Sequence, residues 1–227
     1  MSDNRQKVMD VGRVSVWTLA PGTAFFYLGG MAIDADGAPA AYHPSGARGL
    51  DALGNAGHPG DWWALVTDTG TSGGTPVIQG PTDPAPGFYV STTSLQDTAR
   101  RATDPRRYVD SSTIPYIVLP GAVTRATGAR LGDFAMVVNV RNSRRSPAIF
   151  ADGGPPNKLG EGSIALANAL GVPSNPRSGG AADQIFYVIF PRSGDGRPRL
   201  LADIAARGEQ LFNAWGGMQT VQACLQP

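Results

Sequence analysis

Apolar residues along this chain fall mainly into short runs that turn residues separate. The segment RVSVWTL at 13–19 alternates apolar and polar side chains, the pattern of a strand with one buried face. AFFYLGGMAI at 24–33 predicts a second strand, joined to the first at Pro21-Gly22. Further strands are predicted in the segments 61–68, 69–80 after an initial turn, 87–95, 108–120, 129–142, 146–151 and 184–190.

Two segments favour helix instead. They are IALANAL at 164–170 and residues 199–223, in which DIAARGEQLFNAW supplies an apolar face. The polar residues 1–10 are predicted to be flexible, and residues 38–60 to be loops with one helical turn. About eight short strands between Gly- and Pro-rich turns, with one or two helices, predict a closed or nearly closed β-barrel. No linker divides residues 1–227, so we expect a single domain.

The composition agrees with a compact, turn-rich protein. Hydrophobic residues make up 41% of the 227, enough for a core, while 30 glycines and 19 prolines indicate many turns. The single cysteine, Cys224, excludes an intrachain disulfide and a Cys-ligated zinc site, and we expect it to pack within a C-terminal helix. Only His43 and His58 could supply imidazole ligands, so neither a metal nor another cofactor is predicted.

The charge pattern argues against two classes of partner. Charged residues are few, 16% with a net charge of +1, and no basic stripe or helix suggests binding to nucleic acid. Residues 14–33 carry no charge, but Pro21-Gly22 interrupts them, so no membrane span is expected. The polar residues before this segment, Asp3 and Asp10 among them, do not resemble a signal peptide, and no export signal is expected.

The candidate chemistry lies in residues 146–171. Asp152 ends an apolar strand and Glu161 stands between two glycines just before a helical run. The intervening turn, which contains Gly153, Gly154 and two prolines, favours a path that folds back and brings the two acids together. A pair of carboxyl groups on opposite sides of a glycosidic bond can hydrolyse it. The same two acids could also be ordinary turn and capping residues.

The segment ADGGPPNKLGEGSIALANALG resembles the signature of the family 75 glycoside hydrolases, the fungal-type chitosanases. In that signature, Asp-x-Gly-Pro is followed by a short spacer and Gly-Glu, and Asp152, Gly154, Pro155, Gly160 and Glu161 match it. Further similar segments are 108–120, 128–139 and 187–191, and MAIDADGAP at 31–39 looks like the bacterial branch of the family.

The resemblance implies endo-acting, inverting hydrolysis of β-1,4 bonds in chitosan by Asp152 and Glu161. It also implies a six-stranded double-psi β-barrel with extra strands, long loops and short helices. We expect Asp152 to be the acid, because desolvation at a strand end raises its pKa. Glu161 would be the base, because a helix start favours its ionised form. Family members are secreted, whereas this chain shows no export signal, so its location is left open.

A cationic polysaccharide partner suggests further site residues. Its ammonium groups would be bound by carboxylates and its sugar rings by aromatic side chains. Adjacent residues of a strand face opposite sides, so one of Trp62 and Trp63 is expected in the core. For each aspartate, a turn or capping role is an equal alternative. The candidates for substrate binding are Asp34, Asp36, Asp68, Asp110, Asp133, Tyr116 and Trp62.

Two other functions are open at this point. The first is hydrolysis of another amino-sugar polymer such as peptidoglycan, and the second is a non-catalytic carbohydrate-binding barrel. A serine nucleophile paired with His43 or His58 is disfavoured, because no Gly-x-Ser-x-Gly elbow is present. The DADG turn at 34–37 resembles the start of a calcium loop but lacks the later ligands.

Overall fold

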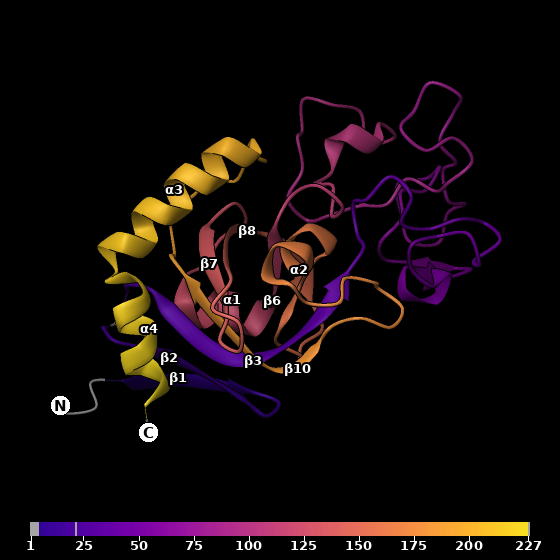
Figure 1. Ribbon diagram of the computed structural model, residues 1–227. Helices are drawn as coiled ribbons and strands as arrows, with labels where there is room; N and C mark the ends of the chain where they lie inside the picture. The colour runs from indigo at the N-terminus through magenta and orange to yellow at the C-terminus, as the bar shows by residue number, and fades with distance from the viewer. Residues whose placement is uncertain (1–4, 21, 227) are drawn as a thin grey trace.

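A closed β-barrel forms the body of the protein in the computed structural model, which describes residues 5–20 and 22–226 (Figure 1). Six strands pair in the order β3-β10-β7-β8-β6-β9, and a parallel pairing of β9 with β3 closes the ring. The predicted mainly β barrel is therefore confirmed, while its double-psi connectivity stays a prediction. The barrel strands are β3 (Phe25–Asp34), β6 (Tyr116–Pro120), β7 (Phe134–Asn139), β8 (Arg145–Gly154), β9 (Glu161–Ser163) and β10 (Ala181–Ile189).

Alternating side chains explain why these strands form a barrel with two apolar faces. In β3, Phe25 and Tyr27 point into the barrel core, whereas Phe26 points outwards into a second core. Tyr187 of β10 stacks on Tyr27 inside the barrel, with ring centroids 4.5 Å apart. Residues on both faces of a strand are apolar here because helices cover the outside of the barrel.

The described part of the chain contains four α-helices beside the barrel. The C-terminal pair, α3 (Leu201–Ala214) and α4 (Gly217–Leu225), lies together on one side of it, at the left of Figure 1. This pair confirms the helical prediction for 199–223, and Cys224 is buried in α4 as expected. α2 (Ile164–Leu170) confirms the predicted helix after the Gly-Glu motif, and α1 (Gly121–Thr127) was not predicted. Among the described residues, no helix is long and apolar enough to cross a membrane.

The N-terminal residues form an additional hairpin at the sheet edge. β1 (Gln6–Val11) pairs antiparallel with β2 (Val14–Thr18), which in turn pairs with β3. The prediction that residues 1–10 are flexible is thus wrong for 6–10, where backbone pairing at an edge tolerates polar side chains; residues 1–4 lie outside the described part. The junction predicted at Pro21-Gly22 includes Pro21, which also lies outside the described residues.

A long irregular segment, 38–110, lies across from the C-terminal helices (Figure 1). Its regular elements are η1 (Leu53–Asn55), β4 (Gly57–His58), β5 (Asp61–Trp62) and η2 (Pro105–Arg107). The predicted helical turn within 38–60 is therefore confirmed. The strands predicted at 61–68, within 69–80 and at 87–95 are reduced to β5 and isolated bridges such as Leu65 to Ser91.

Side-chain hydrogen bonds replace regular pairing within this segment. Gln79, for example, donates to the carbonyls of Pro39 and Tyr89. A small core of its own, including Tyr42 and Trp62, holds the segment together.

Candidate active site

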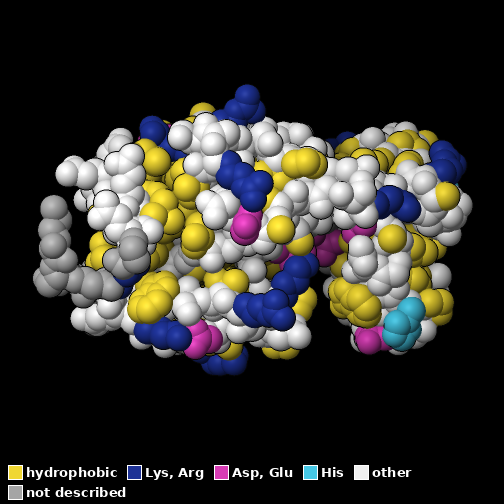
Figure 2. Space-filling view, turned by 60° about the horizontal axis from the view of Figure 1, so that its bottom comes forward, with side chains coloured by type: hydrophobic (Ala, Val, Ile, Leu, Met, Phe, Trp, Pro, Cys, Tyr) yellow, Lys and Arg dark blue, Asp and Glu magenta, His cyan; other side chains and the backbone are white. Residues whose placement is uncertain are grey.

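An acidic cleft of about 590 Å³ lies between the barrel and the irregular segment. Figure 2 shows this face hollowed between a larger and a smaller mass, with acidic side chains gathered inside the hollow. Both motif acids line the cleft, together with residues of β3, of the irregular segment and of the loop before β10. The polar lining residues include Asp34, Asp36, Tyr42, Asp51, Asn55, Trp63, Asp152, Lys158, Glu161 and Arg177.

Close backbone packing places Glu161 at the cleft. The Ala32 N–H of β3 donates to the Gly160 carbonyl at 3.0 Å, and Glu161 then pairs with Ala32. Gly160 has a φ of +97°, and a Cβ there would lie 2.5 Å from the Gly30 carbonyl oxygen. Only glycine permits this approach, which explains the Gly-Glu pair of the motif.

Asp152 is held by three hydrogen bonds to one of its oxygens. Its Oδ1 accepts from the Ser94 N–H at 3.1 Å, the Ser94 hydroxyl at 2.5 Å and the Gly153 N–H at 2.7 Å. In the pairing of β8 with β6, Phe150 lies opposite Ile117 and Asp152 lies opposite Val118, so Ala151 is left unpaired. This is a β-bulge in β8 beside the site. Burial raises the pKa of Asp152 from 3.8 to about 6, although the three hydrogen bonds oppose this shift.

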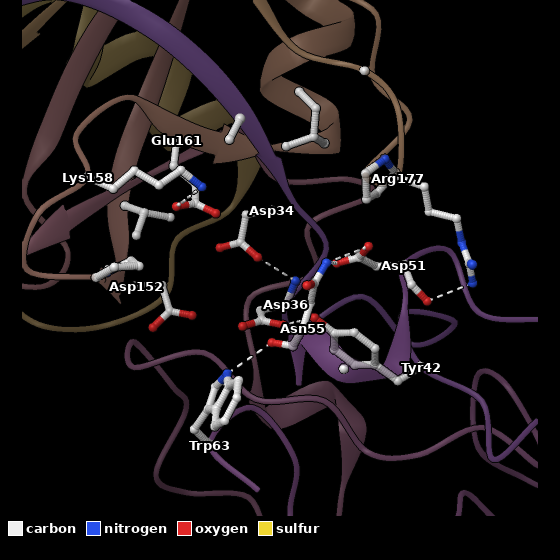
Figure 3. Close-up of a pocket in the computed structure, with 18 of the residues that line it drawn as sticks. Asp34, Asp36, Tyr42, Asp51, Asn55, Trp63, Asp152, Lys158, Glu161 and Arg177 are labelled. Atoms are coloured by element: carbon white, nitrogen blue, oxygen red, sulfur yellow. Dashed lines mark hydrogen bonds and ion pairs between the residues drawn. The ribbon is translucent and has the colours of Figure 1, made fainter. Parts of the chain in front are cut away.

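Asp34 and Asp36 enter the cleft from the turn that follows β3. The Asp36 N–H donates to Asp34 Oδ1 at 2.8 Å, and the Tyr42 hydroxyl donates to Asp36 Oδ1 at 2.6 Å. Burial, followed by the negative charges of Asp152 and Glu161, raises the pKa of Asp34 from 3.8 to about 8. Burial and the charge of Asp34 also raise the pKa of Asp36. Both aspartates, predicted as substrate ligands, therefore lie beside the motif acids (Figure 3).

Glu161 forms an ion pair with Lys158, whose Nζ lies 3.3 Å from Oε2. The sequence predicted that a helix start stabilises the ionised form of Glu161, but Glu161 belongs to strand β9 and does not start the helix. The first helical residue is Ile164, and Ser163 caps α2 by accepting from the Leu166 N–H. The Lys158 side chain, and not a helix start, therefore supplies the positive charge beside Glu161, and the argument from the helix dipole is wrong.

The two adjacent tryptophans take opposite positions. Trp62 is buried in the core of the irregular segment, so the prediction that it binds substrate is replaced by a structural role. Trp63 lines the cleft with 59% of its surface exposed, and its indole N–H donates to the Asn55 carbonyl at 2.9 Å. The prediction that one of the pair faces the core is confirmed.

Arg177 links two walls of the cleft. Arg177 belongs to the loop before β10, and its Nη2 donates to the carbonyls of Gly46, Gly49 and Asp51 in the irregular segment. The Asp51 carboxylate is itself buried and accepts from the Asn55 side chain at 2.9 and 3.0 Å. These contacts brace the wall that carries Trp63 (Figure 3).

The structure does not bring four other predicted residues to the cleft lining. Asp68 is a turn residue that accepts from the Thr75 N–H, and Asp110 accepts from the Ser112 N–H. Asp133 is fully buried and accepts from the backbone N–H groups at positions 130, 192 and 194. Tyr116 is buried beneath the acids, and its hydroxyl donates to the Asp36 carbonyl at 2.9 Å.

Sequence reasoning missed several residues of the site. Lys158 could have been found, because it lies three positions before Glu161 within the motif. Ser94, Tyr42, Asp51 and Arg177 carry no such signal, since long loops bring them to the acids. Oxygen atoms of Asp34, Asp36 and Asp152 lie within 4.8 Å of one another, a grouping that could hold a divalent cation but that also occurs without one.

A comparison with known families agrees with this geometry. A family model described as fungal chitosanase of glycosyl hydrolase group 75 matches residues 84–216, more than half of the chain. The chain belongs to this family. It is a chitosanase-type glycoside hydrolase, and the matched segment contains both Asp152 and Glu161. No curated protein matches the chain.

Membership in the glycosyl hydrolase group 75 family accounts for only part of the cleft. The matched residues include β6 to α3, which hold the two motif acids and Lys158. Asp34, Asp36 and Trp63 lie before residue 84, so this wall of the chitosanase cleft is described by the structure alone.

Proposed function

We propose that this protein cleaves β-1,4 bonds between glucosamine units within chitosan chains by an inverting mechanism. Asp152 acts as the general acid and Glu161 as the general base. The observation that carries the proposal is the position of the two acids, which line one cleft from strands on either side of β6.

Strand pairing places the two acids on opposite sides of β6, a separation that is compatible with inversion. Asp152 of β8 pairs with Val118 of β6, and Gly162 of β9 pairs with the neighbouring Ile117. Two strand spacings therefore separate the backbones of the two acids, about 10 Å. Carboxyl groups in inverting enzymes are about 6.5–9.5 Å apart, which leaves room for the attacking water, whereas about 5 Å is typical of retention.

The surroundings of the two acids support their separate roles. Burial raises the pKa of Asp152 to about 6, so its carboxyl keeps a proton in mildly acidic solution. That proton passes to the leaving oxygen as the glycosidic bond breaks. The ion pair of Glu161 with Lys158 is made by the ionised carboxylate, which is the form that takes a proton from water. The water oxygen then bonds to the sugar carbon from the face opposite the leaving group.

The walls of the cleft suit an amino-sugar polymer. Carboxyl and carbonyl oxygens line this cleft, Asp36 among them, and they can accept hydrogen bonds from ammonium groups of the substrate. With a net charge of only +1 on the whole chain, this attraction has to be local to the cleft. Trp63 offers an exposed indole whose orientation is fixed by its bond to Asn55, a surface on which a sugar ring can stack. The hollow lies open on one face of the molecule, which suits attack within a chain (Figure 2).

The test measures reducing ends released from chitosan, chitin and peptidoglycan by the wild type and by Glu161→Gln. We expect activity on chitosan that Glu161→Gln loses, together with an early product of inverted anomeric configuration in proton NMR. Activity confined to peptidoglycan would assign a different polymer, and retained configuration would contradict the inverting mechanism. Binding to chitosan without turnover would refute the catalytic proposal.

A further inference from the structure

Ser94 of the irregular segment lies beside the acid Asp152, although 58 positions separate the two residues in the sequence. The N–H of Leu95, the next residue, donates to the carbonyl of Ala151 at 2.8 Å. Ala151 is the residue of β8 that the bulge leaves unpaired with β6, so its carbonyl finds a partner outside the barrel. Leu95 is also buried in the same core as Ala151. The bulge therefore gives the irregular segment a fixed point of attachment next to the acid.

Two further hydrogen bonds fix the backbone on either side of Ser94. The Thr93 hydroxyl donates to the Leu95 carbonyl at 2.7 Å and accepts from the Val109 N–H at 3.0 Å. Thr93 and Leu95 are both buried, whereas Ser94 between them is exposed. The two anchored neighbours therefore hold Ser94 at the surface in contact with Asp152.

Within the described part of the chain, Asp152 accepts hydrogen bonds through one oxygen only. Its Oδ1 accepts from the Ser94 N–H, the Ser94 hydroxyl and the Gly153 N–H. The Gly153 N–H also donates to Ser94 Oγ at 3.3 Å, which directs the hydroxyl proton away from Gly153 and towards Asp152. A carboxyl oxygen has about two lone pairs, and three donors occupy them. In the protonated acid, Oδ1 is therefore the carbonyl oxygen and Oδ2 carries the proton.

We propose that Ser94 is a positioning residue for the general acid, which it holds with the proton on Oδ2 available to the cleft. This inference rests on the proposed function, in which Asp152 is the acid. Ser94 itself does not line the cleft, whereas Asp152 does and faces Asp34 and Asp36 across it (Figure 3). Ser94 therefore acts through Asp152 and not on the substrate.

The reaction step assigns a use to each oxygen of Asp152. The bond between the sugar carbon and the leaving oxygen breaks, and the oxygen keeps the electron pair. The Oδ2–H bond breaks at the same time, and its proton joins the leaving oxygen. The three donors at Oδ1 stabilise the carboxylate that results. Asp152 then regains a proton from solvent, and Glu161 releases to solvent the proton that it took from the attacking water.

A second serine makes the same pair of contacts away from the cleft. The N–H and the hydroxyl of Ser112 both donate to Oδ1 of Asp110, at 2.8 and 2.6 Å. Ser112 is exposed, as Ser94 is, and neither Ser112 nor Asp110 lines the cleft. Ser112→Ala therefore removes an equivalent hydrogen bond without affecting the acid, and it is the matched control for Ser94→Ala.

The test compares kcat and KM on chitosan with those on the β-fluoride of a glucosamine oligosaccharide. Fluoride leaves as an ion without a proton, so this substrate needs the base Glu161 but not the acid. We expect Ser94→Ala to lower kcat on chitosan about tenfold with KM unchanged, part of the roughly 10²–10⁴-fold that a general acid contributes. Release of fluoride should stay close to the wild-type rate. Ser94→Thr, which keeps the hydroxyl, should recover most of kcat, and Ser112→Ala should match the wild type on both substrates.

Two reference variants show on which side of the reaction Ser94 acts. Asp152→Asn should lose hydrolysis of chitosan but keep release of fluoride, whereas Glu161→Gln should lose both. If Ser94→Ala loses both activities alike, changes neither or changes only KM, the role proposed for Ser94 is overturned. The same holds if Ser94→Thr is as slow as Ser94→Ala. With Asp152→Asn inactive on chitosan, these results count against Ser94 alone. An Asp152→Asn variant that keeps full activity on chitosan would instead refute the proposed function, and the role of Ser94 with it.

Discussion

Replacing Asp34 by asparagine should stabilise the folded protein at neutral pH. In the folded state the pKa of Asp34 is raised from 3.8 to about 8, chiefly by burial. Above pH 4 the unfolded chain releases this proton while the folded state retains it. The stability associated with Asp34 is therefore fully present below about pH 4 and is lost as the pH rises towards 8.

The size of the effect follows from the same values. The unfolded chain loses the Asp34 proton near the ordinary pKa of 3.8, about three pH units below pH 7. At ~1.4 kcal/mol for each unit, retaining this proton in the folded state costs about 4 kcal/mol of stability at pH 7. Because Asp34 is only partly buried from solvent, we expect about 2–4 kcal/mol. Asparagine can still accept the Asp36 N–H, so the turn after β3 keeps its hydrogen bond.

Urea unfolding of the wild type and Asp34→Asn at pH 4 and pH 7 measures this difference. We expect nearly equal free energies of unfolding at pH 4 and a more stable variant at pH 7. The control Asp203→Asn, which removes an exposed carboxylate at the start of α3, should be unchanged at both. An asparagine variant that gains the same stability at both pH values, or none at pH 7, would refute the reasoning about a retained proton.

Four further substitutions test the cleft and the structure around it. Trp63→Ala should raise KM for chitosan about tenfold with little change in Tm, whereas Trp62→Ala should lower the free energy of unfolding by about 3–5 kcal/mol, as loss of a buried indole does. Steady-state kinetics measures the first effect and urea unfolding the second. A reversed pattern would contradict the assignment of the cleft wall. Asp133→Ala should cost about 2–4 kcal/mol of stability because it leaves three backbone N–H groups without their acceptor; a loss below about 1 kcal/mol would show that water replaces it. Arg177→Ala should increase amide exchange at residues 46–51 without moving the pH profile, and unchanged exchange would mean that the three carbonyl contacts do not brace the wall.

The barrel could be predicted because turn residues separate its apolar strands into short runs. Side chains of β3, β7, β8 and β10 divide between the inner and outer cores at every second position, so these strands appear in the sequence as short, continuous apolar runs between turn residues. β1 could not be predicted this way. Of its six residues only Val11 is buried, and its pairing uses backbone groups that any residue carries.

The irregular segment shows where pattern reasoning fails. Alternation predicted that one of Trp62 and Trp63 is buried, but not which one. That choice depends on Ala35, Ala38 and Tyr42, which form the small core against Trp62 and come from a distant loop. Other loops bring Ser94 to Asp152 and Arg177 to the wall of the cleft, and no local spacing signals such contacts.

Local sequence also could not separate site acids from structural ones. Asp34 opens an Asp-Ala-Asp-Gly turn and Asp133 follows a glycine, and both looked equally suited to bind an ammonium group. Asp34 faces the cleft, while Asp133 turns inward to three backbone donors. Only the tertiary path of the chain distinguishes them. The motif acids could be recognised by the glycines around them. At Gly160 the structure explains this, because the close approach to the Gly30 backbone requires glycine there.

The central claim, that Asp152 and Glu161 act together on one glycosidic bond, is tested most directly by comparing Asp152→Asn, Glu161→Gln and the double variant in kcat on chitosan. Acid and base that work as a unit should each cost about 10²–10⁴-fold when removed, and the double variant should fall little further. A single variant that retains activity within tenfold of the wild type while correctly folded would contradict the claim.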